Sequence, residues 1–525
     1  MGRTRFIFVL AAFPLFTHGL AHAQHAVLTY HNDIFRTGGY RQETKLTPAN
    51  VNSTTFGKLF IMPADGLVDA QPLYVPGLTV ASATHNVVFV ATENDTVYAY
   101  DADTSGAPLW QVTMLKSGET PSDNRGCGQI TPQIGVTSTP AIDTTVGPHG
   151  TMYVIAMSKD STGNYHQRLH ALDITTGAEQ FGGPVDVAAT YPGTGENSSG
   201  GQVVFDPAQY DERAALLISN GAVITSWGSH CDAQPYTGWV MSYSETSLSQ
   251  LSVLDLTPNG GEGAVWQTGN GPAADGAGNI YLLVANGTFD TTLNASGFPS
   301  QGDYGNAFMK ISNSSNKLAV ADYFTMFNTV SESDADEDLG SGGAMLIPDL
   351  TNTSGKTVQL AVGAGKDSNL YIVNRSNMGK FNPSSNNIYQ ELSGALPGGV
   401  WSSPAYHDGR IYYAANGDYL RSFYWQDNVF TLGSKSAHQF GYPGATPCVS
   451  SNGTSDAIVW VTENVSPAVL WAYPGANLAT VLYNSTQAGT RDNFGNGNKF
   501  ITPMVANGKV YVGTQTGVGV FGLLP

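Results

Sequence analysis

One short pattern recurs eight times between Gln71 and the C-terminus, and it restricts the possible folds more than any other feature. Each copy opens with a small or polar residue, usually next to a proline, and continues as an apolar strand, a turn and a second strand rich in Val, Ile and Tyr. The copies begin QPLYV at Gln71, TPAID at Thr139, QVVFD at Gln202, GPAAD at Gly271, GGAML at Gly342, SPAYH at Ser403, TPCVS at Thr446 and TPMVA at Thr502. Their spacing is too long for a solenoid coil and suits a four-stranded propeller blade. We therefore expect an all-β, eight-bladed propeller of antiparallel sheets.

The two ends of the chain are expected to meet in the last blade. The segment after Pro503 provides inner strands but no outer one, and FGKLFIM, which starts at Phe56, can supply it from upstream of the first repeat. A ring closed in this way leaves no open sheet edge for another chain to pair with. The sequence thus predicts one propeller domain over residues 24–525, closed by the N-terminal strand.

Composition and charge agree with this fold and exclude one class of partner. The 61 Gly and 27 Pro residues, with only 12% charged residues, indicate many short strands joined by tight turns. The formal net charge of −18 repels phosphate backbones, and no basic cluster is visible. We expect no nucleic-acid partner.

The first 23 residues have the pattern of a cleavable signal peptide. Arg3 and Arg5 precede the apolar run FIFVLAAFPLF, and Ala21-His22-Ala23 is a small-x-small cleavage site. The run is too short to span a bilayer, and no other segment approaches that length. We expect an exported, soluble protein, periplasmic or secreted, without a membrane span.

The three cysteines are expected to form one disulfide. Cys127 and Cys231 lie in connections on the same face of adjacent predicted blades, and an oxidising compartment favours their pairing. Cys448 lies on a predicted innermost strand and is expected to be free and buried. No CxxCH sequence occurs, so no attached haem is expected.

Polar residues that break the strand pattern gather in blades three to five. They include Asp232 in WGSHCD, Asn286 in VANGTFD, Asp338 in DADEDLGSGG and Lys366 in GAGKDSNLY. Converging at one channel mouth, their oxygens could bind a hard cation and the ammonium group an anionic ligand. The alternative is structural, with DADED a solvated acidic turn, Asn286-Gly287 a hairpin turn and Lys366 a loop cap.

The stretch W-x(8)-D-x(3)-NIYLLVANG, starting at Trp266, resembles the pyrroloquinoline quinone (PQQ) dehydrogenases, the eight-bladed quinoprotein alcohol dehydrogenases. The resemblance implies that Trp266 forms the floor under the quinone and that Asn286 binds calcium. It makes Asp338 the catalytic base and metal neighbour, and it places Lys366 at the quinone oxygens. Trp401 is implied to lie at the cofactor as well.

The chain also departs from the family's pattern. The adjacent cysteine pair beside the quinone is absent, and Asp232 is the acid nearest the position of a metal-binding glutamate. Val400 replaces the asparagine expected before Trp401. Gly340 stands where lanthanide-using members carry an aspartate, which favours calcium.

Two functions follow from these observations. The resemblance implies a haem-free dehydrogenase that oxidises an alcohol or sugar hydroxyl by Ca²⁺-assisted hydride transfer to PQQ. Such an enzyme would then pass the electrons to a separate acceptor. The missing family residues leave open a non-catalytic propeller that serves as an exported binding or assembly scaffold.

Overall fold

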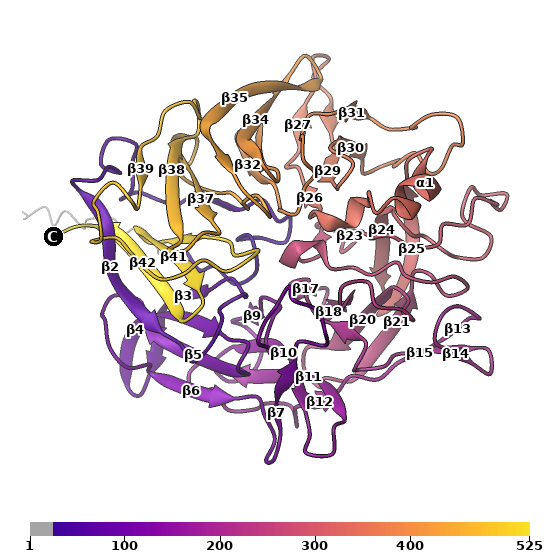
Figure 1. Ribbon diagram of the computed structural model, residues 1–525, viewed down its shortest axis with the longest axis horizontal. Coiled ribbons are helices and arrows are strands. Elements are labelled where there is room, and N and C mark those ends of the chain that lie inside the picture. Colours follow the sequence, from indigo (N-terminus) through magenta and orange to yellow (C-terminus); the bar gives the residue numbers. More distant parts are fainter. Residues whose placement is uncertain (1–24) are drawn as a thin grey trace, which may run out of the picture.

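The computed structural model describes residues 25 to 525, whose regular secondary structure is almost entirely β-strand (Figure 1). The strands pair antiparallel, except that β1 (Gly39–Tyr40) pairs parallel with β36 (Cys448–Asn452). The predicted signal peptide, residues 1–23, lies outside the described residues. The sheets follow one another around a common centre, and the last sheet, in yellow, lies beside the first. None of the described helices is long and apolar enough to cross a membrane.

The first half of the described chain contains four principal sheets of four strands. The first has β3 (Leu73–Val80), β4 (Ala83–Ala91), β5 (Thr96–Asp101) and β6 (Trp110–Thr113). The second has β9 (Ala141–Asp143), β10 (Thr151–Lys159), β11 (Tyr165–Asp173) and β12 (Val185–Asp186), with β7 (Thr120–Asp123) and β8 (Gln133–Ile134) added alongside. The third has β17 (Leu217–Ser219), β18 (Ala222–Ser226), β20 (Trp239–Ser244) and β21 (Gln250–Asp255). The fourth has β22 (Ala273–Ala274), β23 (Ile280–Leu283), β24 (Phe308–Ser314) and β25 (Lys317–Phe324).

The second half continues the same arrangement. The fifth sheet has β26 (Met345–Leu346), β29 (Leu360–Ala364), β30 (Leu370–Asn374) and β31 (Gln390–Leu392). The sixth has β32 (Ala405–His407), β33 (Arg410–Ala414), β34 (Asp418–Gln426) and β35 (Val429–Phe440). The seventh has β36 (Cys448–Asn452), β37 (Ser455–Glu463), β38 (Val469–Pro474) and β39 (Tyr483–Asn484), and β1 (Gly39–Tyr40) pairs with β36. The last has β40 (Met504–Ala506), β41 (Lys509–Thr514), β42 (Gly517–Leu523) and β2 (Phe56–Pro63).

Few elements lie outside these sheets. Short ladders join β13 (Thr190–Pro192), β14 (Ser198–Ser199) and β15 (Gln202–Val204), then β16 (Tyr210–Asp211) with β19 (Gly228–Ser229), and β27 (Leu350–Thr351) with β28 (Thr357–Val358). One α-helix, α1 (Thr329–Asp334), and two 3₁₀ turns, Gln267–Gly269 and Leu339–Ser341, complete the described elements.

The last sheet joins two distant parts of the chain. β2 pairs antiparallel with β42, from Phe56 opposite Leu523 to Pro63 opposite Gly517. This is the pairing that the sequence predicted for FGKLFIM. The same sheet packs on both neighbours, because one buried cluster contains Trp460 of the seventh sheet, Val520 of the last and Val88 of the first. Burial between neighbouring sheets therefore stabilises the arrangement as a whole.

The segment over residues 27–43 bonds to the inner part of every principal sheet. Its partners, from the first sheet to the last, are Tyr74 with Val27, Ile142 with Leu28, Leu216 with Arg36, Ala274 with Ile34, Leu346 with Phe35, Tyr406 with Thr37, Val449 with Gly38 and Gly508 with Glu43. Seven of these partners lie on or next to the inner strand of a sheet, and the eighth, Gly508, lies in the turn between β40 and β41. The bonds satisfy backbone groups that would otherwise lack a partner. One segment thus fixes the sheets around their common centre.

Arg36 is the centre of this segment and is fully buried. Its guanidinium donates to the carbonyl oxygens of Tyr30, Leu216 and Pro272 and to the Thr29 hydroxyl, over 2.6–3.1 Å. Burial lowers the pKa of Arg36 to about 10, which leaves it charged at neutral pH. All of its nitrogens have acceptors, so the charge is compensated by oriented carbonyl groups.

The third repeat begins later than the sequence pattern predicted. QVVFD does not open the third sheet, because β15 pairs with β13 and β14 instead. The inner strand is β17, and a two-residue turn at Asn220-Gly221, with positive φ at both residues, joins it to β18. An Asn-Gly turn between apolar strands is a strong hairpin signal. Here this turn marks the inner strand, although QVVFD also resembles the start of a repeat.

We predict that Arg36→Met lowers the free energy of unfolding by at least about 3 kcal/mol, since several buried acceptors lose their donor. Denaturant unfolding measures the change. Arg41→Met is the matched control, because Arg41 lies five residues further along the segment and is exposed. Equal stability of the two variants would show that the segment does not hold the sheets together.

Candidate functional site

A cavity of about 320 Å³ lies where loops of several sheets converge. All the residues that the sequence singled out line it, namely Cys127, Cys231, Asp232, Trp266, Asn286, Asp338, Lys366 and Trp401. These residues come from loops that follow or precede inner strands in five sheets. The fold thus brings residues up to 274 positions apart to one opening, with polar groups on some walls and aromatic rings on others.

An acidic loop and a lysine form the polar part of the cavity. Asp338 precedes the 3₁₀ turn Leu339–Ser341, and Lys366 follows β29. Lys366 Nζ lies 2.8 Å from Asp338 Oδ1 and also contacts the Asp336 carboxylate. Asn286, which lies beyond β23, donates its amide N–H to Asp336 Oδ1 over 2.7 Å. The two carboxylates therefore share one ammonium group.

Burial sets the ionisation of this group. Asp338 is 1% exposed, and desolvation raises its pKa to about 6, although the Lys366 ammonium acts in the opposite direction. Burial tends to lower the pKa of Lys366, but Asp338 and Asp336 outweigh it and raise that pKa. At neutral pH, Asp338 is an ionised, buried carboxylate close to its titration range, as a proton acceptor requires.

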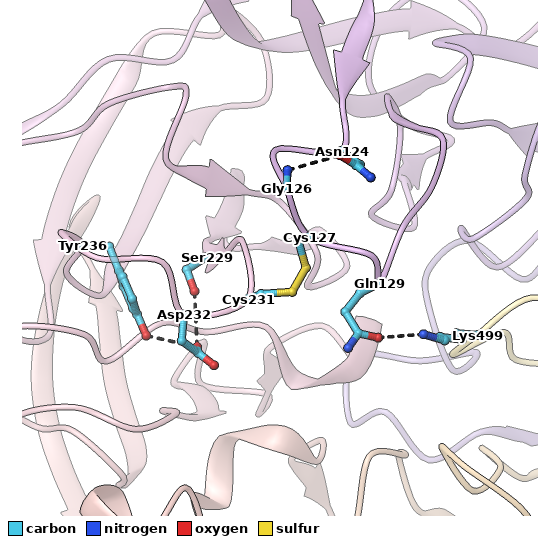
Figure 2. The surroundings of a disulfide bond; sticks show 9 residues. All are labelled: Asn124, Gly126, Cys127, Gln129, Ser229, Cys231, Asp232, Tyr236 and Lys499. Carbon is cyan, nitrogen blue, oxygen red and sulfur yellow. Dashed lines mark hydrogen bonds between the residues drawn. A yellow bond between two sulfur atoms is a disulfide. The ribbon is translucent and has the colours of Figure 1, made fainter.

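Two buried oxygens in the cavity wall lack hydrogen-bond partners among the described residues. They are Asn286 Oδ1 and Asp338 Oδ2. Amide and carboxylate oxygens are the ligands that calcium prefers, so these atoms fit a hard cation. Asp232 is exposed, and its Oδ1 accepts from the Tyr236 hydroxyl over 3.1 Å (Figure 2). No group of three or more His, Cys, Asp or Glu side chains within residues 25–525 is arranged as a metal site.

Aromatic rings form the apolar part of the cavity. The Trp266 ring lies 6.0 Å from the Phe500 ring at 75°, and the Trp401 ring lies 5.8 Å from the Tyr442 ring at 67°. Both tryptophans are half-buried, which leaves ring surface in the cavity wall. Walls of this kind suit a flat, partly apolar ligand.

A disulfide closes one side of the cavity (Figure 2). It joins Cys127 and Cys231, whose Cα atoms are 5.5 Å apart and which are separated by 104 residues. This is the pair that the sequence favoured, and Cys448 is free and buried, as expected. Beside the disulfide, Lys499 Nζ donates to Gln129 Oε1 over 3.0 Å, which ties the same loop to the chain before β40.

The sequence analysis missed three charged residues of the cavity, namely Asp211, Arg213 and Asp336. Asp336 belongs to DADED, where the sequence analysis singled out Asp338 instead. In the structure, Asp336 is the residue that contacts both Lys366 and Asn286. Arg213 lines the cavity in the segment between β16 and β17. It was overlooked because the third repeat was placed at Gln202, so that DERAALL had no position relative to an inner strand.

Comparison with solved structures places the fold. The chain is similar to quinohemoprotein alcohol dehydrogenase from Comamonas testosteroni, with a TM-score of 0.63 and 14% identity over 96% of this chain and 81% of that chain. The same enzyme class from Pseudomonas putida HK5 gives a TM-score of 0.61 and 14% identity over 95% and 80%. A europium-containing methanol dehydrogenase is similar with a TM-score of 0.59 and 13% identity, over 95% of this chain and 98% of that chain.

The sequence itself has no comparable match, since no family model fits it and no curated protein matches it significantly. The chain therefore shares the propeller fold of the quinoprotein alcohol dehydrogenases, as the sequence resemblance predicted.

We predict that replacing both Cys127 and Cys231 with serine lowers the free energy of unfolding by about 2–4 kcal/mol, because the disulfide closes a loop of 104 residues. Unfolding under reducing and non-reducing conditions measures the difference in the wild type, and the variant should show none. Mass mapping of non-reduced peptides provides the chemical check. Free thiols at both positions, or a bond from either one to Cys448, would contradict the assignment.

Proposed function

We propose that the protein is an exported, soluble PQQ-dependent dehydrogenase that oxidises an alcohol or sugar hydroxyl. In this proposal residues 1–23 are a signal peptide, and residues 24–525 form a closed propeller of eight blades. One observation carries the proposal. Every residue that the family resemblance assigned to the cofactor, the metal or the base lines the same cavity, although those residues are spread over distant repeats.

The cavity residues divide into those that would hold the cofactor and those that would hold the metal. Trp266 and Trp401 provide ring surfaces for a planar quinone, and Lys366 provides an ammonium group for its oxygens. Asn286, Asp338 and Asp232 provide the oxygens for Ca²⁺. When bound, PQQ would supply a two-electron acceptor and Ca²⁺ a Lewis acid.

Asp338 would take the proton of the substrate hydroxyl. Its carboxylate is ionised above about pH 6, and its Oδ2 has no donor among the residues described. Lys366 holds the other oxygen and keeps the carboxylate in place over 2.8 Å. Asp338 is buried, and its low exposure to water strengthens these charge interactions. Electrons would then leave to a separate acceptor.

The second candidate is a non-catalytic scaffold with the same fold. It is favoured by the position of Lys366, whose ammonium group already compensates both Asp338 and Asp336 and would compete with a metal ion. In that case the cavity residues would form a structural ion-pair cluster, and neither PQQ nor Ca²⁺ would bind.

We predict that purified protein binds PQQ in the presence of Ca²⁺ at micromolar concentrations, which changes the absorption spectrum of the quinone. Trp266→Ala should weaken this binding by about 0.5–1.5 kcal/mol beyond the lost contact area. Trp425→Ala is the matched control, because Trp425 is half-buried on β34 and does not line the cavity. A wild-type protein that shows no calcium-dependent binding would favour the scaffold.

We predict that Asp338→Asn lowers the rate of alcohol or sugar oxidation by about 10²–10⁴-fold, since the amide cannot accept a proton. PQQ binding should persist in this variant. In the wild type the rate should fall as the pH drops through about 6, because protonation of Asp338 removes the base. Asp334→Asn, an exposed acid of α1, is the control. A rate that stays constant through pH 6 would assign the base to another residue.

A further inference from the structure

Arg213 is a buried cation whose hydrogen-bonding capacity is incompletely used. It lies between β16 and β17, is 5% exposed and lines the cavity. Its Nη1 is 3.7 Å from Asp69 Oδ1, and its Nη2 has no hydrogen-bond partner among the residues described. The Asp211 carboxylate also lines the cavity and interacts electrostatically with Arg213, but Nη2 still has no acceptor among the residues described. Burial of a charged N–H group without an acceptor is unfavourable, so this nitrogen is available to a further partner.

The other cation of the cavity differs in this respect. Lys366 contacts two carboxylates, Asp336 and Asp338. Arg36, the other deeply buried arginine close to the centre, donates through all of its nitrogens. Arg213 is thus the cavity cation with an unpartnered nitrogen, and a planar guanidinium group pairs well with a carboxylate.

The surroundings of Arg213 also define the shape of the partner. Its guanidinium carbon lies 5.0 Å from the centre of the Phe500 ring, and that ring packs edge-on against Trp266. The cation and the two rings therefore form one continuous wall.

We propose that Arg213 is the anion anchor of this cavity and that the ligand is a planar aromatic molecule carrying a carboxylate. The inference rests on the proposed function for the choice of cavity and deepens it by naming the group that holds the charge of the ligand. The alternative partner is Asp69, whose Oδ2 also lacks a hydrogen bond among the described residues. In that case Arg213 would close onto Asp69 and bind no ligand.

Two probes of matched size and shape separate these possibilities. We expect 2-naphthoate to bind the full-length protein at least about tenfold more tightly than the neutral 2-naphthamide, as measured by calorimetry or probe fluorescence. Arg213→Gln should weaken naphthoate binding by about tenfold to a hundredfold and leave naphthamide binding unchanged. Arg125→Gln is the charge-matched control, since Arg125 already donates to Ala208 and Tyr165 and does not line the cavity.

A conservative variant keeps the test valid if Arg213→Gln does not fold. Arg213→Lys keeps the charge but loses the planar guanidinium group. Its affinity for naphthoate should therefore lie between those of the wild type and Arg213→Gln. Equal binding of naphthoate and naphthamide, binding of neither probe, or an affinity unaffected at Arg213 would overturn the proposal. Tighter binding of 2-naphthyl phosphate than of 2-naphthoate would overturn the carboxylate assignment.

The outcome is distinguishable from that of the PQQ experiment. If naphthoate binding depends on Arg213 but the protein does not bind PQQ with Ca²⁺, the proposal for Arg213 stands and the proposed dehydrogenase function is rejected. If wild type and Arg213→Gln bind PQQ equally strongly, the proposed dehydrogenase function stands and the proposal for Arg213 is rejected.

Discussion

The structure depends on hydrogen bonds between residues 27–43 and the inner part of each sheet. Strands that converge on a centre expose backbone groups that no neighbouring strand can satisfy. Here one segment satisfies them in turn, and Arg36 adds a buried charge whose hydrogen bonds all go to carbonyl and hydroxyl oxygens. Because the segment lies at the centre, it also fixes the relative positions of the loops that surround the cavity.

The cavity combines a buried acid with polar groups that lack partners among the described residues. A buried carboxylate, Asp338, has its pKa raised to about 6 by desolvation, and a guanidinium nitrogen of Arg213 and an amide oxygen of Asn286 lack partners among the described residues. Each of these groups makes the folded protein less stable than a well-paired alternative would. Such costs are typical of functional sites, where residues are placed for a ligand rather than for stability. This is the physical reason for expecting a ligand in the cavity.

The sequence predicted the parts of the fold that repeat. Proline recurs at most inner strands, and FGKLFIM was matched to the last sheet because that sheet lacked an outer strand. It did not predict the third inner strand, because the repeat pattern placed that strand at QVVFD. The Asn220-Gly221 turn is the sequence signal that marks its correct position. Nor did it predict the central segment, because residues 27–43 have no periodicity and their partners lie in eight other parts of the chain.

The same division holds for the cavity. Asp338, Lys366 and Trp266 were found because they stand at fixed positions relative to strands, and a resemblance could therefore be carried over to them. Arg213 and Asp336 were missed because their role follows from which atoms they approach, and that depends on how loops of different sheets pack. The sequence pattern thus predicted which repeats contribute residues to the cavity. The three-dimensional contacts identified which charged groups of the cavity lack partners among the described residues.

A crystal structure of the protein grown with PQQ and Ca²⁺ would test the central claim most directly. The account predicts planar density against the Trp266 ring and a metal ion bound by Asn286 and Asp338. A cavity without such density under saturating PQQ, with Lys366 still paired to Asp338 and Asp336, would contradict it.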